Sequence, residues 1–417
     1  MSARTVVSLW PLFFGLSLVG LAAGVQGTLL GYRAEVEGFD DALIGLLMSA
    51  YFAGFLLGSV FAPRLIDRVG HIRTFAAVSA LASVTILVHA SFVEPWTWSV
   101  MRLITGFAFS CIYVVTESWL NEAATNETRG QILSVYMLIL LGGTCAGQFM
   151  LTVADPAGLA LFVLVSVMIS VAAMPILMTV MRTPALETSE RVSVLHLWRR
   201  AKMGVIGLVL IQWCSSMMYG MGAVYAAKMA LGAREVALFM GAIMGGAMLM
   251  QWPLGHVSDR VDRRWVMGGA SLIAVGAGVY ASTQTQAGWP LYLSALVFGG
   301  FTLSQYSLVV SSIHDHLRPS EMTPASGTIV MLSGAVCISG PLTVSFSLQW
   351  FGLQSFFLLM SGILLLMAVI SLYRVIMIPA LPPEYKTHAV LQLPVSPVGS
   401  VLHPEEKDVV EHPGRAA

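Results

Sequence analysis

Twelve long apolar segments limit how this chain can fold more than any other feature of its sequence. A helix needs roughly 20 mostly apolar residues to cross a bilayer, and within lipid it must satisfy its own backbone hydrogen bonds. All twelve segments have helical length, so the sequence predicts an all-α integral membrane fold. The expected spanning helices cover residues 6–30, 41–62, 74–93, 96–120, 130–153, 158–181, 203–227, 235–256, 265–284, 289–313, 322–347 and 353–378.

The composition supports lipid as the surrounding solvent. Of the 417 residues, 57% are hydrophobic and only 11% are charged, whereas a soluble domain carries about 25% charged residues. The net charge of zero argues against a nucleic acid or another acidic polymer as a partner. We therefore expect the lipid bilayer to be the main surface that the chain contacts.

Lysine and arginine concentrate in the loops on one side of the expected membrane. With a cytoplasmic N-terminus, thirteen of these cations fall in inner loops and three in outer loops. Cytoplasmic loops of membrane proteins carry an excess of Lys and Arg, so we expect both termini in the cytoplasm. The three outer cations are Arg33, Lys228 and Arg234.

The longest internal polar segment divides the expected helices six and six. It separates an N-terminal six-helix bundle, residues 1–181, from a C-terminal six-helix bundle, residues 203–378, with a cytoplasmic linker over 182–202. Residues 379–417 are rich in Pro, Glu and His and have no apolar period. We expect this last segment to be a disordered cytoplasmic tail.

A short charged sequence occurs once in each half. The junction after the second segment reads PRLIDRVGHIR, and the junction after the eighth reads GHVSDRVDRR. Each places Asp-Arg-Val four residues after Pro63 or Gly255, where we expect the preceding helix to end. Asp67 and Asp259 are separated by nearly half the chain, which predicts that the two bundles are an internal repeat, as in many transporters.

These two junctions resemble the loop motif of the major facilitator superfamily, G-x-L-x-D-R-x-G-x-[RK]. The first half differs at Pro63 and the second at Asp262, each of which stands where the motif has glycine. The matching residues are Leu65, Asp67, Arg68, Gly70 and Arg73 in the first half and Gly255, Asp259 and Arg260 in the second.

Further stretches strengthen the resemblance, which covers roughly residues 6–378. The fourth-helix motif of the superfamily is matched by Arg102 and Gly106. The resemblance implies two pseudo-symmetric six-helix bundles, secondary transport by alternating access, and a multi-pass location in a bacterial inner membrane. Similarity to the YcaD-like bacterial branch lies at Glu117–Asn121, at Arg129-Gly130 and at Gln251–Gly255.

In this superfamily such junctions act as a cytoplasmic latch, and the resemblance implies the same role here. Arginines and a nearby helix N-terminus can both hold a carboxylate at the inner membrane face. Contacts that form in one state and break in the other give the two-state element of alternating access. Topology signalling by the arginines alone is the alternative. The gate candidates are Arg64, Asp67, Arg68, Arg73 and Glu117, then Asp259, Arg260, Arg264 and Asp315.

Each half has one expected acidic partner for these cations. Glu117, near the inner end of the fourth segment, is expected to pair with the first-half arginines of the latch. Asp315, near the end of the tenth, is expected to pair with Arg260 or Arg264. For Glu117 a proton-carrying carboxylate and a merely solvated acid are the alternatives.

Arg102 lies about six residues, roughly 9 Å, inside the outer end of the fourth segment. An arginine at that depth is costly unless it faces a cavity or finds acceptors. It is either a cavity residue that binds an anionic group or tunes a proton site, or a structural residue bonded to helix 1 or to backbone carbonyls. Snorkelling to the outer face is a third interpretation.

The expected spanning helices hold few acids, and aromatic and amide side chains supply many of their polar groups. Polar side chains that recur along one face of such a helix serve either helix packing or ligand contact. Together with 24 methionines they suit an adaptable, amphiphilic cavity. The candidate cavity residues are Tyr113, Tyr136, Gln148, Gln212, Tyr219 and Gln305.

The sequence indicates no other chemistry. It has no Gly-x-x-x-x-Gly-Lys-Ser/Thr loop and no Cys/His cluster, so we expect no ATP use, no cofactor, no metal and no enzyme activity. The favoured function is a monomeric secondary active transporter of a small organic amphiphile or metabolite, driven by an ion gradient, with protons as the favoured ion. A transport-inactive membrane sensor or partner-binding protein is the alternative.

Overall fold

The computed structural model describes residues 3–123, 128–178 and 192–377. Within these residues, twelve helical spans are long and apolar enough to cross a membrane, which confirms the predicted number and makes the chain a multi-pass membrane protein. The first half contains α1 (Ala3–Val36), α2 (Asp41–Val69), α3 (His71–Ser91), α4 (Pro95–Ala123), α5 (Arg129–Phe149), the 3-10 turn η1 (Met150–Thr152) and α6 (Ala160–Leu177).

The second half begins with a short helix, α7 (Val194–Arg200), which lies inside the predicted linker. One of its spans is built from two helices that meet at Ser304, α11 (Trp289–Leu303) and α12 (Gln305–His314). The other spans are α8 (Lys202–Lys228), α9 (Ala233–Arg260), α10 (Arg263–Ser282), α13 (Pro319–Phe351) and α14 (Ser355–Met377).

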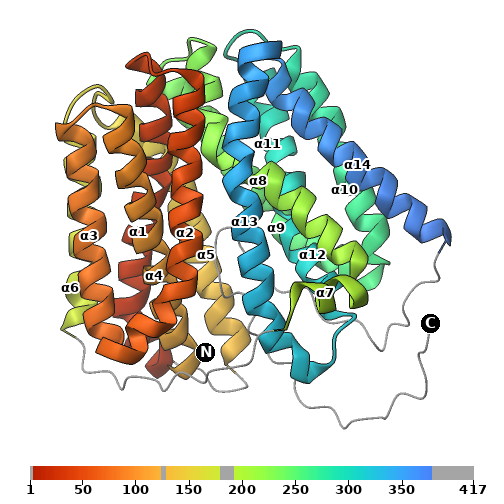
Figure 1. Ribbon diagram of the computed structural model, residues 1–417, viewed down its shortest axis with the longest axis horizontal. Coiled ribbons are helices and arrows are strands. Elements are labelled where there is room, and N and C mark those ends of the chain that lie inside the picture. Colours follow the sequence, from red (N-terminus) through yellow and green to blue (C-terminus); the bar gives the residue numbers. More distant parts are fainter. Residues whose placement is uncertain (1–2, 124–127, 179–191, 378–417) are drawn as a thin grey trace.

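The two halves form neighbouring bundles with equivalent internal packing (Figure 1). In the first, a Cβ at Gly54 of α2 would lie 1.8 Å from the carbonyl oxygen of Leu103 in α4. In the second, a Cβ at Gly246 of α9 would lie 2.0 Å from the carbonyl oxygen of Leu296 in α11. Small residues permit such backbone contact between membrane helices. The second and fourth spans of each half therefore pack in the same way, as an internal repeat predicts.

The ends of the membrane-spanning helices lie on two faces of the molecule. The first, here called the Asp-Arg face, carries the ends of α2 and α9 with their Asp-Arg pairs. The second, here called the opposite face, carries the connections α1–α2, α3–α4, α8–α9 and α10–α11. Because successive spans run in opposite directions, the predicted outer cations Arg33, Lys228 and Arg234 all belong to the opposite face.

The structure corrects where the Asp-Arg pairs lie. Helix α2 continues through Pro63 to Val69, and α9 continues through Gly255 to Arg260, so both pairs occupy the last turn of a helix and not a loop. Proline is tolerated inside a membrane helix because its surroundings satisfy the backbone groups it leaves unpaired. Helix α2 ends instead at Gly70, whose φ of 86° is a conformation that glycine adopts without strain.

The surface along which the halves meet is called the seam. It joins α2 to α13, α1 to α8 and α5 to α9. Gly45 near the start of α2 is so close to α13 that an added Cβ would lie 2.6 Å from the Cβ of Ser345. Gly241 near the start of α9 would similarly lie 2.6 Å from the ring of Phe149. These contacts belong to the part of each helix nearer the opposite face.

Candidate functional site

In the second half, the junction between α9 and α10 is an ordered ion-pair cluster. The Nε of Arg263 lies 3.1 Å from Oδ2 of Asp315, and the two side chains are only 3% and 6% exposed. The Nη2 of Arg263 lies 3.7 Å from Oδ1 of Asp259. Asp262 caps α10 by accepting a hydrogen bond from the backbone N–H of Arg264, whose side chain also approaches it to 2.6 Å. Charged residues thus link the ends of α9, α10 and α12.

This cluster corrects a predicted pairing. The sequence predicts Arg260 or Arg264 as the partner of Asp315, but the partner is Arg263. Helix α10 begins at Arg263, which directs this side chain toward α12. Arg264 instead donates to the carbonyl oxygen of Arg374 at 3.0 Å, and Arg260 is exposed at the end of α9.

The first-half junction has a different arrangement. Arg64, Asp67, Arg68 and Arg73 are all exposed. Within the part of the chain that the structure describes, none of the four forms an ion pair. The guanidinium of Arg64 lies over the ring of Phe61, 5.5 Å from its centroid. The charged side chains of the first-half junction are therefore exposed at the surface of the molecule.

Glu117 lies apart from those exposed arginines. Its side chain is 1% exposed and accepts a hydrogen bond of 2.6 Å from the hydroxyl of Tyr136 in α5. The predicted pairing with Arg64, Arg68 or Arg73 is not formed in this structure, because Glu117 faces the interior of the bundle.

Arg102 is a buried cation at the edge of the seam. It is 4% exposed, which excludes snorkelling, and its guanidinium lies 4.4 Å from the centroid of the Tyr51 ring. Its Nη2 lies 3.6 Å from the sulfur of Met48, and its Nε has no hydrogen-bond partner in the described part of the chain. Among the described residues, no carboxylate lies within ion-pair distance of it. Met48 in turn packs against Gly31 and Gly220, so one side chain separates Arg102 from α8.

Two of the predicted cavity residues are occupied by contacts within their own halves. Gln148 accepts a hydrogen bond from Thr28 and donates to the carbonyl oxygen of Gly24 at 3.1 Å, which ties α5 to α1. Gln305 accepts from Ser271 at 3.0 Å, which ties α12 to α10. Both amides are buried, and their contacts fit the helix-packing interpretation of these residues.

The remaining cavity candidates lie on α4, α5 and α8. The ring of Tyr113 is 6.1 Å from that of Phe55 in α2, and Tyr219 is partly buried in α8. Gln212 is buried against α13, with its Nε2 3.9 Å from the sulfur of Cys337. Tyr136, the last candidate, is the donor to Glu117 described above.

Sequence reasoning missed a cluster on the opposite face. The Nζ of Lys228, the last residue of α8, lies 2.6 Å from Oδ1 of Asp41 and 3.0 Å from Oε2 of Glu35. Lys228 belongs to the second half and both acids to the first. A signal was present, because these are opposite charges at the outer ends of expected helices from different halves.

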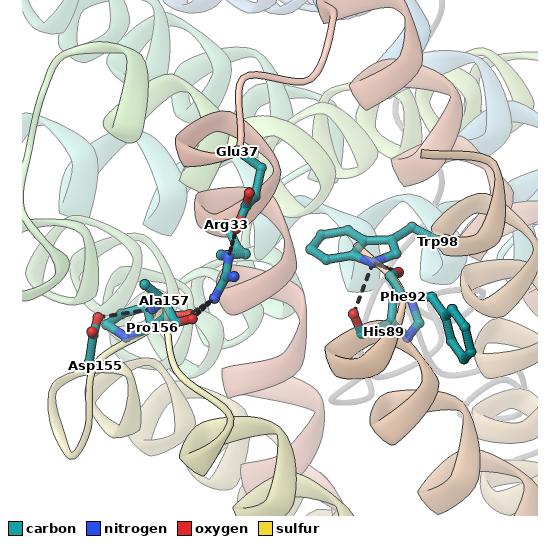
Figure 2. A network of polar contacts seen from close by, with 8 residues as sticks. All are labelled: Arg33, Glu37, His89, Phe92, Trp98, Asp155, Pro156 and Ala157. Carbon is teal, nitrogen blue, oxygen red and sulfur yellow. Dashed lines mark hydrogen bonds and ion pairs between the residues drawn. The ribbon is translucent and has the colours of Figure 1, made fainter. Parts of the chain in front are cut away.

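First-half contacts hold the rest of this face in place (Figure 2). Arg33 forms an ion pair with Glu37 and donates to the carbonyl oxygens of Pro156 and Ala157. Trp98 closes the α3–α4 connection by donating its indole N–H to backbone carbonyls at 2.8 and 3.0 Å. Arg33 therefore links the end of α1 to the α5–α6 connection, and Trp98 stabilises the α3–α4 connection.

Known proteins resemble the chain along most of its length. A family model described as Major Facilitator Superfamily matches residues 12–251 and also residues 208–405. An uncharacterized MFS-type transporter YcaD of Salmonella heidelberg is 29% identical over 296 residues, which are 70% of this chain and 76% of that protein. The YcaD of Salmonella arizonae is 26% identical over 355 residues, 84% of this chain and 91% of that protein.

Solved structures share the fold at low sequence identity. The crystal structure of the nucleoside transporter NupG has a TM-score of 0.69 and 14% identity, covering 89% of this chain and 99% of that one. A bacterial homologue of the human lysosomal transporter Spinster, inward-facing and unoccupied, has a TM-score of 0.72 and 13% identity, covering 89% of this chain and 97% of that one. By its family match, its twelve spans and its repeated junctions, the chain belongs to the Major Facilitator Superfamily of membrane transporters.

Proposed function

We propose that this chain is a secondary active transporter that moves a small organic amphiphile or metabolite by alternating access. The observation that supports this most is the position of the seam. Gly31, Gly45 and Gly241 bring the two halves together near the opposite face. Two bundles that pack closely at one end can rock about a binding site between them. Because the contacts of these three glycines lie near the opposite face, the Asp-Arg face is the side toward which such a site would open.

The Asp-Arg face is the cytoplasmic one in this proposal. The excess of Lys and Arg in its connections supports that orientation, with both termini in the cytoplasm and the chain in a bacterial inner membrane. The state of the structure is then inward-open.

The Asp-Arg pairs form the latch of the proposed cycle. Helices α2 and α13 run antiparallel along the seam, so closing the cytoplasmic side brings Asp67 toward the N-terminus of α13. By the same geometry, Asp259 approaches the N-terminus of α5. A helix N-terminus attracts a carboxylate through its unpaired N–H groups and its dipole. The latch forms when the cytoplasmic side closes and releases when it opens.

Arg102 supplies the cargo contact. A cation this deeply buried has no acid among its described neighbours, and an anionic group on the cargo would complete its environment. Tyr51 offers an aromatic ring 4.4 Å from the guanidinium of Arg102, and Tyr113 and Tyr219 remain the proposed aromatic contacts for an amphiphile elsewhere along its path. Protons are the coupling ion in this proposal, with the buried carboxylate of Glu117 as the intramembrane acid.

The first test identifies a cargo and then removes Arg102. Purified protein is screened for ligands that raise its melting temperature at two pH values, and each hit is assayed for flux in proteoliposomes. Arg102→Ala is expected to abolish flux of an anionic hit while the protein still melts cooperatively, because the cargo charge loses its counter-ion.

Arg102→Met, which keeps the side-chain volume, controls for packing and should lose flux as well. Parent-like flux in both variants would remove Arg102 from the mechanism. If an electroneutral cargo were carried at the same rate by all three proteins, the assignment of an anionic group would be wrong.

A further inference from the structure

We propose that Lys228 is an ion-pair gate on the opposite face, which closes that face by joining the two halves and thereby sets the balance between the two open states. The inference rests on the proposed function, since a gate requires that the seam opens during the cycle. The gate consists of Lys228, Glu35 and Asp41.

The gate is a direct contact between the halves. Besides its contact of 2.6 Å with Asp41, the Nζ of Lys228 lies 3.0 and 3.2 Å from the two carboxylate oxygens of Glu35. The three side chains are 19%, 22% and 23% exposed, so they are partly shielded from solvent and salt. Partly buried pairs are screened less than exposed ones. One cation from the second half therefore holds two acids from the first.

Two of the three gate charges, Lys228 and Asp41, lie at the helix end that favours them, whereas Glu35 lies in the last turn of α1. Lys228 is the last residue of α8, and Asp41 is the first residue of α2. A cation at a helix C-terminus and an anion at an N-terminus are both stabilised by the helix dipole. The capping of α2 falls to Asp40, whose carboxylate accepts from the N–H of Ala42 at 2.9 Å. Asp41 is therefore available to the other half, and both charges remain stable when the halves separate.

Arg33 does not compete with Lys228 for the two acids of the gate. Arg33 is the nearest cation in sequence to the two acids of the gate, and it is committed to Glu37 and to the carbonyl oxygens of the α5–α6 connection (Figure 2). The first half thus presents Glu35 and Asp41 as acids whose cation comes from the second half. This distribution of charge is what a contact between separable bodies requires.

The gate is continuous with the packed seam below it. The hydroxyl of Ser345 in α13 donates to the carbonyl oxygen of Asp41, and Gly45, one turn further along α2, packs against the same serine. On the other side, the backbone N–H of Leu231 donates to the carbonyl oxygen of Ala226 at 3.2 Å, which fixes the chain just after Lys228. Opening this face must separate the gate and these contacts together.

The position of the gate also allows it to open. A fully buried ion pair leaves an uncompensated charge when its partner is removed, at a high cost. The gate residues are about one fifth exposed, so water can solvate each of them once the halves part. The ion pairs then favour closure of the opposite face but do not prevent its opening.

The test measures distances between the halves by electron–electron double resonance of spin labels, in nanodiscs and without cargo. One label pair reports the opposite face, at exposed Val93 and Trp289, and the other reports the Asp-Arg face, at exposed Val69 and Val261. Lys228→Gln is expected to lengthen the first distance and shorten the second, with about a tenfold rise in the ratio of the two states, equivalent to roughly 1.4 kcal/mol. The native cysteines to be replaced first are Cys111, Cys145, Cys214 and Cys337.

Two further variants make the test specific. Arg234→Gln removes an exposed cation from the same face that forms no ion pair among the described residues, and it should leave both distances unchanged. Lys228→Glu should shift the distances further than Lys228→Gln, and adding Asp41→Lys should return them toward the parent. Glu35→Gln removes one acid only and should give a smaller shift.

The outcomes separate the gate from the transport proposal. Parent-like distances in Lys228→Gln, in a protein that still exchanges cargo, would overturn the gate alone. An equal shift in Arg234→Gln would also overturn it, because the effect would then be one of general surface charge. Shifted distances in Lys228→Gln, reversed by the charge exchange, establish the gate even if no cargo flux is ever found.

Discussion

The two Asp-Arg junctions share a sequence pattern but place their charges differently. His71 and Arg263 each stand four residues after the aspartate, and each is the first residue of a helix. Both are buried, at 1% and 3% exposure. His71 contacts the hydroxyl of Ser118 at 2.9 Å, whereas Arg263 contacts the carboxylate of Asp315 at 3.1 Å. Among the contacts between described side chains, the first half thus has one to a neutral hydroxyl where the second half has an ion pair.

The two halves of the repeat therefore share the geometry of this junction more closely than the chemistry of its side chains. In both halves a side chain at the start of the third span reaches the end of the fourth span on the Asp-Arg face and closes the junction. In the second half that link is ionic and draws in Asp259, while in the first half Asp67 stays exposed. The first-half junction is therefore the more accessible part of the proposed latch, and the second-half junction is also part of the folded core.

The largest expected effect comes from breaking the buried ion pair. Asp315→Asn should destabilise the protein by about 3 kcal/mol, because it leaves Arg263 buried with a weaker counter-charge. The matched first-half change, Ser118→Ala, removes a hydrogen bond to His71 and should cost about 1 kcal/mol. Unfolding of both variants in mixed detergent–SDS micelles measures the difference.

A transplant of the first-half pair is the control for that comparison. Arg263→His combined with Asp315→Ser should recover much of the stability that Asp315→Asn loses, because no charge then remains buried. If Asp315→Asn unfolded like the parent, the ion pair would not contribute to stability, and the two junctions would be energetically alike.

The sequence predicted the parts of this molecule that depend on local hydrophobicity. Spanning helices follow from apolar length, and the repeat from two matching junctions. Pairings were harder to predict because they depend on where each helix begins. Arg263 and Arg264 are adjacent cations, and the start of α10 at Arg263 decides that this residue reaches Asp315. The pairing of Lys228 with Asp41 was missed because it joins residues far apart in the chain, through a seam that no local pattern describes.

Helix boundaries give the second comparison, with an intermediate effect. Gly70 ends α2 at a φ of 86°, and a Cβ added there would have no described neighbour within 4 Å, so Gly70→Ala should cost about 1–2 kcal/mol from backbone strain alone. Asp262 starts α10 as its N-cap, so Asp262→Ala should cost about 1 kcal/mol. The same SDS titration measures both. A Gly70→Ala variant as stable as the parent would show that α2 can end without this conformation.

The smallest expected effect on stability concerns the exposed aspartate. Asp67→Asn should change the unfolding free energy by less than about 0.5 kcal/mol, since Asp67 is exposed and forms no ion pair among the described residues. Cargo exchange should nevertheless slow, because closure of the Asp-Arg face in the proposed cycle loses the attraction between this carboxylate and the N-terminus of α13. Asp259→Asn should slow exchange too, with a somewhat larger loss of stability because Arg263 lies 3.7 Å from Asp259. Melting curves and proteoliposome flux on the same preparations distinguish the two effects: parent-like flux in both variants would refute the latch, and a large loss of stability in Asp67→Asn would show that this junction, like its counterpart, belongs to the folded core.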